Sequence, residues 1–108
     1  MSDRYPKQDA MFTPKLEAQF ERFAELREDF CINYGYNTAR AYWADLDDIL
    51  WWAAEHGKDP LALTDDDIGQ YLARMKRQGY SPSTVRRRLT AWRGFTKTYG
   101  HVAPVSKP

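Results

Sequence analysis

Apolar residues recur every three or four positions along most of the chain, which is the spacing of amphipathic helices. No segment alternates strictly between apolar and polar residues, as a half-buried strand would. The pattern predicts four helices, and glycines mark the ends of the first three: Thr13 to Gly35, Asn37 or Thr38 to Gly57, Thr64 to Gly79, and Ser81 to Tyr99. Because the connections are short, we expect an all-α fold in which four helices pack as one bundle.

Capping residues mark the predicted helix starts. Thr13 and Ser81 each precede a proline, the typical order of an N-cap residue followed by the first helical position. Thr64 and Asp67 have the spacing of a capping box, and the carboxylates at 65–67 are favoured by the positive end of a helix dipole. We therefore interpret this acidic triplet as a helix start rather than a metal site.

The apolar residues of each predicted helix fall on one face, and these faces predict the core of the bundle. They are Leu16, Phe20, Phe23, Phe30 and Tyr34; Tyr42, Leu46, Ile49, Leu50 and Ala53; Ile68, Tyr71, Leu72 and Met75; and Val85, Leu89, Trp92, Phe95 and Tyr99. Arg27 falls within the first face, so its side chain must reach solvent or find a carboxylate. Trp51 points away from the second face, and it is either covered by another part of the protein or an interaction site.

The chain has 108 residues, which suits one domain with a single modest core. We divide it into a flexible arm over 1–12, the helical domain over 13–100 and a linker over 101–108. No apolar run is long enough to span a membrane, and the polar start lacks the apolar stretch of a secretory signal. The single cysteine, Cys31, suits a reducing compartment, so we predict a cytoplasmic protein.

The net charge of +1 conceals a strong asymmetry along the chain. All 15 acidic residues lie within 1–67 beside seven basic residues, so this stretch has a net charge of −8. Residues 68–108 contain nine Lys or Arg and no Asp or Glu, which gives +9. Such a separation points to nucleic acid or an acidic protein as the partner, unless the folded surface mixes the two halves.

Signatures of catalytic chemistry are absent from the sequence. His56 and His101 have no Cys or His partner at metal-ligand spacing. There is no glycine-rich phosphate loop and no G-x-S-x-G element. We therefore predict no catalytic residue, no cofactor, no metal and no small-molecule substrate, which leaves a binding module.

The last predicted helix contains three consecutive arginines that point in different directions. Arg87 points nearly opposite the core, and Arg88 lies at the margin of the core, where its stem can pack. A cationic stripe lies about a quarter turn from the apolar face and comprises Arg86, Thr90, Arg93 and Lys97. Because no acidic residue in this helix neutralises the stripe, it suits phosphate oxygens along a DNA groove.

The start of the same helix adds hydroxyl groups and free backbone N–H groups that favour an anion, at Ser81, Ser83 and Thr84. Together with the stripe, these residues favour nucleic-acid binding. A solvated helix face and an acidic protein partner remain the alternatives.

Two segments resemble signatures of the N-terminal, core-binding domain of tyrosine recombinases, the family of phage integrases and Xer-type recombinases. The first signature, T-x-x-x-Y-x-x-D-L-x-x-[FI]-x-x-W, is matched by Thr38, Tyr42, Asp45, Leu46, Ile49 and Trp52. The second is matched by LTDDDIGQYL over 63–72 and by GYSPSTVRRRLTAWRGF over 79–95. Both signatures occur in the expected order, and the resemblance covers roughly 16–100.

The resemblance implies a SAM-like, orthogonal four-helix bundle that forms half of a clamp around duplex DNA and assembles on it with other recombinase protomers. In this family the second and fourth helices approach the DNA, which implicates Asn37, Thr38, Arg40, Ser81, Ser83, Thr84, Arg86, Arg87, Arg93 and Lys97, with Thr90 inside the stripe. Gly35 replaces the helix-start serine of the family. The cleavage residues of the family lie in a C-terminal catalytic domain, so this chain is expected to bind DNA in the nucleoid without catalysing cleavage.

Two further interpretations stay open. The chain could be a helical interaction module whose cationic stripe meets an acidic protein, with Trp51 as the anchor. It could also be a stand-alone, non-catalytic regulator that binds DNA with the same fold.

Overall fold

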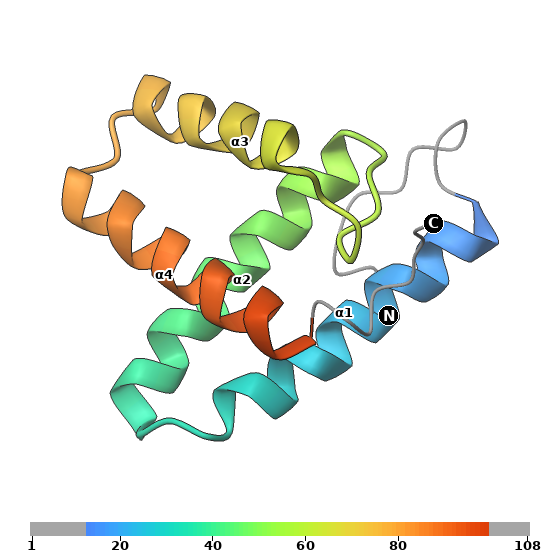
Figure 1. Ribbon diagram of the computed structural model, residues 1–108, viewed down its shortest axis with the longest axis horizontal. Coiled ribbons are helices and arrows are strands. Elements are labelled where there is room, and N and C mark those ends of the chain that lie inside the picture. The colour runs from blue at the N-terminus through green and yellow to red at the C-terminus, as the bar shows by residue number, and fades with distance from the viewer. Residues whose placement is uncertain (1–12, 100–108) are drawn as a thin grey trace.

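The computed structural model describes residues 13–99, which form four helices joined by short loops (Figure 1). They are α1 (Pro14–Cys31), α2 (Tyr36–Glu55), α3 (Asp65–Arg77) and α4 (Pro82–Tyr99). No strand occurs within 13–99, and the predicted all-α, four-helix fold is confirmed. The predicted arm over 1–12 and the linker over 101–108 lie outside the described residues.

The helix starts are capped as the sequence predicts. The hydroxyl of Thr13 accepts a hydrogen bond from the backbone N–H of Leu16 at 3.1 Å, and a proline follows at the first helical position. Thr64 and Asp67 form both bonds of a capping box, at 2.9 and 3.1 Å. These bonds satisfy backbone N–H groups that lack a partner within the helix, so they fix where α1 and α3 begin.

The boundary between α1 and α2 differs from the prediction. α1 already ends at Cys31, and Gly35 is the N-cap of α2 rather than the stop of α1. The side-chain amide of Asn33 donates to the backbone carbonyls of Asp29 and Phe30, so an asparagine satisfies the end of α1 without a glycine. α2 then begins at Tyr36, slightly before the predicted start, and no side chain caps it.

Aromatic residues make up much of the buried core. In Figure 1, α2 and α4 cross, with α3 above them and α1 below. Phe23 of α1 packs against Phe95 of α4 with ring centroids 4.7 Å apart, and Phe30 meets Phe95 edge-on at 5.9 Å. Gly94 permits this approach, because a Cβ at that position would lie 3.1 Å from Cζ of Phe30. The contacts between α1 and α4 are therefore largely contacts between rings.

Arg27 lies in the core, where its charge requires a carboxylate partner. Its side chain is fully buried, and Nη1 donates to Oδ1 of Asp47 at 2.7 Å. The guanidinium also lies over the ring of Trp43, 4.1 Å from the ring centroid. The prediction that Arg27 finds a carboxylate is confirmed, and the ion pair joins α1 to α2.

Candidate nucleic-acid interface

The buried face of α4 is rotated relative to the predicted one. Ala91 is fully buried, whereas Leu89 and Tyr99 are only half-buried. The small residues Ala91 and Gly94 allow the helix to pack closely on this side, and Gly94 lies against the ring of Phe30. As a result, the cationic stripe lies roughly opposite the core, rather than a quarter turn from it.

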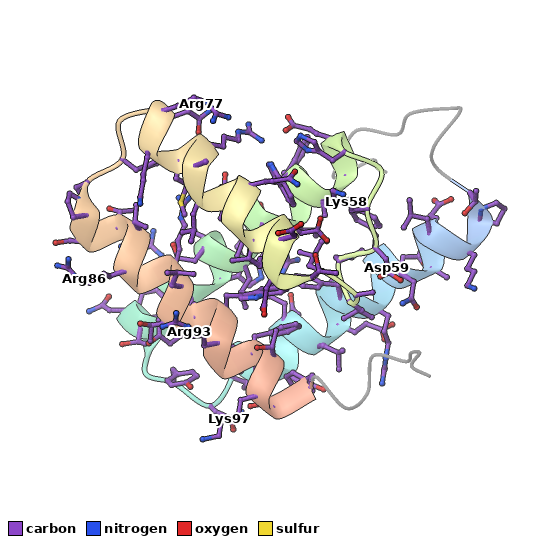
Figure 2. All side chains as sticks on the ribbon, turned by 45° about the horizontal axis from the view of Figure 1, so that its top comes forward. Lys58, Asp59, Arg77, Arg86, Arg93 and Lys97 are labelled. Atoms are coloured by element: carbon purple, nitrogen blue, oxygen red, sulfur yellow. The ribbon has the colours of Figure 1, made fainter. Side chains whose placement is uncertain are left out.

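All members of the cationic stripe are exposed: Arg86, Thr90, Arg93 and Lys97. Figure 2 shows its three basic side chains following one another along the outer side of α4. Within 13–99, none of the three forms an ion pair. The predicted stripe is therefore a solvent-facing row of cations without an internal counter-charge among the described residues.

Arg87 differs from its predicted position. It faces α2 rather than pointing away from the core, and its Nε and Nη2 donate to Oδ2 and Oδ1 of Asp45 at 2.8 and 2.6 Å. Asp45 is fully buried, while the Arg87 side chain is 45% exposed. The hydrogen bonds to Asp45 raise the pKa of Arg87 above its ordinary value. Two of its nitrogens thus join α4 to α2 through Asp45. Only the outer part of the guanidinium is then free to bind a ligand.

Arg88 connects three helices. Its Nε donates to Oδ1 of Asp45 at 3.1 Å, and its Nη1 donates to Asp48 at 2.8 Å and to the hydroxyl of Tyr71 at 3.1 Å. The Tyr71 hydroxyl in turn donates to Asp48, and the guanidinium lies over the ring of Tyr80. The structure thus confirms the prediction that Arg88 lies at the margin of the core, and it adds the partners.

The same network shifts the pKa values of its members. Burial by itself lowers the pKa of Arg88, but the charges and hydrogen bonds of Tyr71, Asp48 and Asp45 outweigh it, so the pKa is raised. Burial and the hydrogen bond to Asp48 raise the pKa of Tyr71. Arg88 therefore stays charged and Tyr71 stays protonated at neutral pH, which is the combination that the network needs.

Other carboxylates of α2 and α3 also have basic partners. Glu55 accepts from Arg74 at 2.7 Å, and Asp67 lies 3.0 Å from the ammonium of Lys58. The fold thus pairs carboxylates of the acidic half with basic residues inside or beside the core. This sorting leaves the stripe on α4 without neutralisation within 13–99, so the charge asymmetry of the sequence survives on this face.

At the start of α4, Ser81 acts as the cap. Its Oγ accepts from the backbone N–H of Thr84 at 3.2 Å and donates to the Thr84 hydroxyl at 3.1 Å. The side chain of Ser83 is exposed, and the stripe begins three residues later at Arg86. These hydroxyl groups are therefore next to the stripe, although those of Ser81 and Thr84 bond to each other.

The predicted residues of α2 do not all lie on one side. Thr38 precedes Asp45 by seven residues, so it lies on the face of α2 that meets Arg87 of α4. Asn37 is exposed beside it, whereas Arg40 lies about 140° around the helix from Asp45. The Arg40 guanidinium stacks over the ring of Tyr36, 5.6 Å from its centroid. The structure thus brings Thr38 towards the α4 side and separates Arg40 from it.

Sequence reasoning missed the partners of the α4 arginines. Asp45 belongs to the first signature and Arg87 and Arg88 to the second, so the two signatures meet in one ion-pair cluster. A buried carboxylate within an apolar helix face was the available signal, because such a group requires a basic partner. The distance of more than 40 residues in the chain concealed which partner it was.

Comparison with known proteins places this chain in a family. Residues 31–99 match the phage integrase N-terminal SAM-like domain, and the chain belongs to this family. Over 69 residues it is 38% identical to tyrosine recombinase XerC of Pelotomaculum thermopropionicum. The aligned region covers 58% of this chain and 22% of XerC. The chain thus spans about a fifth of the length of that relative. No solved structure matches the chain.

The family match confirms the resemblance that the two signatures indicated. Its SAM-like description agrees with the four helices of the fold. No helix within 13–99 is both long and apolar enough to cross a membrane.

Proposed function

We propose that this chain binds duplex DNA as the N-terminal, core-binding part of a tyrosine recombinase. The observation that carries the proposal is the row of exposed basic side chains on α4 without an ion pair within 13–99. Membership in the phage integrase family and the similarity to XerC support it. As part of the same proposal, the protein is located in the cytoplasm at the nucleoid, and its partners on DNA are other recombinase protomers.

In this proposal, Arg86, Arg93 and Lys97 contact phosphates along one groove of the duplex. Arginine can bind a phosphate or a guanine edge through two nitrogens, whereas lysine acts as a point charge. Thr90 and Ser83 add hydroxyl donors beside them, and Ser81 and Thr84 position the backbone N–H groups at the start of α4. Asn37 and Thr38 contact the backbone from α2, while Arg40 and the outer part of Arg87 contribute at the margins.

Strand cleavage is assigned to other parts of the recombinase rather than to this chain. The tyrosines of the helical core have packing or hydrogen-bonding roles here. The Tyr71 hydroxyl donates a hydrogen bond to Asp48 and the residue is nearly fully buried, and its raised pKa makes it a poor nucleophile. Tyr42 packs against Phe30 with ring centroids 6.1 Å apart. We therefore propose a role in holding DNA, with no catalytic residue in this chain.

The test compares two double variants with the same change in net charge. Arg86→Ala with Arg93→Ala should weaken duplex binding about 10- to 100-fold at low salt and lower the salt slope by about two, because two phosphate contacts are lost. Lys76→Ala with Arg77→Ala removes two exposed cations from the end of α3 and should have little effect. In Figure 2, Arg77 lies away from the three labelled basic residues of the stripe. Fluorescence anisotropy over a range of salt concentrations measures both quantities.

Equal losses in the two double variants would show that net charge, and not the stripe, determines binding. If the wild-type chain does not bind duplex DNA even at low salt, the proposal is wrong. A partner captured after nuclease treatment would then favour the protein-interaction module, with Trp51, which is 39% exposed, as a candidate anchor.

A further inference from the structure

The loop between α1 and α2 exposes large side chains close to the proposed DNA-facing surface. Within five residues, Ile32, Tyr34 and Tyr36 are 82%, 41% and 76% exposed. A contiguous exposed apolar patch marks a contact with a partner, whereas single exposed side chains are ordinary, so the neighbours of each residue decide. The three residues differ in what surrounds them: Tyr34 packs against Phe30 of α1 and Tyr42 of α2, whereas Tyr36 lies under the guanidinium of Arg40.

Tyr34 stands against an aromatic cluster that joins α2 to α4. Its ring meets Tyr42 edge-on with centroids 5.1 Å apart and packs against Phe30 at 5.3 Å. Phe30 in turn lies against Gly94 and Phe95 of α4. The ring of Tyr34 is therefore fixed by its neighbours, whereas part of the residue faces solvent.

Tyr34 contacts α2 directly through Tyr42 and is connected to α4 indirectly through Phe30. Tyr42 follows Thr38 by four residues and lies on the same side of α2. Phe30, the other neighbour of Tyr34, lies against Gly94, which belongs to the turn of α4 that carries Arg93 and Lys97. Within 13–99, Tyr34 forms a hydrogen bond through its backbone N–H to Cys31, and its hydroxyl has no hydrogen-bond partner. Contacts within 13–99 therefore do not explain why this position carries a hydroxyl group.

We propose that Tyr34 is a further DNA-binding residue, whose hydroxyl donates a hydrogen bond to a backbone phosphate between the contacts of α2 and those of α4. This proposal rests on the proposed DNA binding of the chain. The absence of acidic residues from Cys31 to Ala44 makes duplex DNA the favoured occupant of this surface. Tyrosine is suited to the role, because its fixed ring presents a donor at little entropic cost.

Tyr34→Phe is the direct test, since it removes the hydroxyl and keeps the ring. We expect duplex binding to weaken about 10-fold, the cost of a lost hydrogen bond to a charged oxygen. The salt slope should stay unchanged, because a neutral donor releases no counterion. The melting temperature should also stay unchanged, because the hydroxyl bonds to no other residue within 13–99.

Tyr36→Phe is the matched control. Tyr36 is only two residues away and more exposed, but it lies about 160° around α2 from Thr38 and under the guanidinium of Arg40. Tyr36→Phe keeps the ring under Arg40, which contributes only at the margin of the proposed interface, and removes a hydroxyl that points away from Thr38, so duplex affinity should stay unchanged. An equal loss in both variants would overturn the assignment to Tyr34, because it would indicate an effect of the whole loop.

The outcomes separate this proposal from the proposed function. If Tyr34→Phe binds like the wild type while the Arg86 and Arg93 double variant binds weakly, the role of Tyr34 is wrong and DNA binding stands. If the wild-type chain does not bind duplex DNA, the proposed function itself fails. A lower melting temperature for Tyr34→Phe that accounts for its weaker binding would assign the hydroxyl to folding and overturn the proposal.

Discussion

Arg86 and Arg88 are two residues apart on the same helix, yet their surroundings differ completely. Arg86 is exposed and has no ion pair within 13–99. Arg88 is 11% exposed and bonds to Asp45, Asp48 and Tyr71. Consecutive arginines in a helix point about 100° apart, so one run can supply both a structural cation and a free one. Their roles follow from the carboxylates that the fold places nearby.

The two sides of α4 therefore predict different consequences of mutation. On the paired side, removal of a cation takes away one partner of a buried carboxylate, which lowers stability. On the stripe side, removal of a cation leaves folded contacts intact and changes only what the surface attracts. Three measurements of stability test this contrast, in order of decreasing effect.

Arg88→Met should have the largest effect. It keeps the aliphatic stem but removes the guanidinium that compensates Asp45 and Asp48, so the free energy of unfolding should fall by about 3–5 kcal/mol. Urea denaturation measures this change. Lys97→Met, on the stripe, should change it by less than about 0.5 kcal/mol. A loss below about 1 kcal/mol for Arg88→Met would mean that the network contributes little to the fold.

Arg87→Ala should have an intermediate effect, about 1–2 kcal/mol, because Asp45 retains Arg88 and because solvent screens the half-exposed Arg87. The adjacent Arg86→Ala should change stability by less than about 0.5 kcal/mol. Urea denaturation of the two single variants compares neighbours that differ only in their partners. Equal losses would contradict the assignment of structural and free arginines.

Tyr71→Phe should have the smallest effect at neutral pH, about 1 kcal/mol, for the lost hydrogen bond to Asp48. Its signature is at alkaline pH. The raised pKa means that folded Tyr71 keeps its proton where the unfolded chain loses it, above about pH 10. The folded state then binds more protons, so this contribution to stability falls as the pH rises. The variant should lose less stability than the wild type between pH 9 and pH 11, and parallel curves would contradict this role.

Local features of the fold were predictable from the sequence. Caps such as Thr13 and the Thr64–Asp67 capping box depend on residues three positions apart, and the structure confirms them. The spacing of apolar residues gave the number of helices and most of the core. The start of α2 was misplaced because Asn33, rather than Gly35, satisfies the end of α1.

The candidate interface was predictable only in part, because its geometry depends on tertiary packing. The helical wheel grouped Arg86, Thr90, Arg93 and Lys97, and the structure confirms that all four are exposed. The helical wheel could not show that α4 packs on the bundle through the small residues Ala91 and Gly94. Because of this packing, the buried face is rotated relative to the predicted one, and Arg87 faces Asp45. The DNA contacts themselves stay predictions, which the paired variants test.

The burial of Asp45 also determines the order in which the domain can assemble. A ribosome produces α1, α2 and α3 before α4, and a nascent chain that stops short of Pro82 contains the carboxylate but neither of its guanidinium partners. Such a chain would bury Asp45 without a cationic partner, so we expect the domain to close only once the last helix is present. That helix carries the cationic stripe, and every copy of the domain that has finished folding therefore displays it.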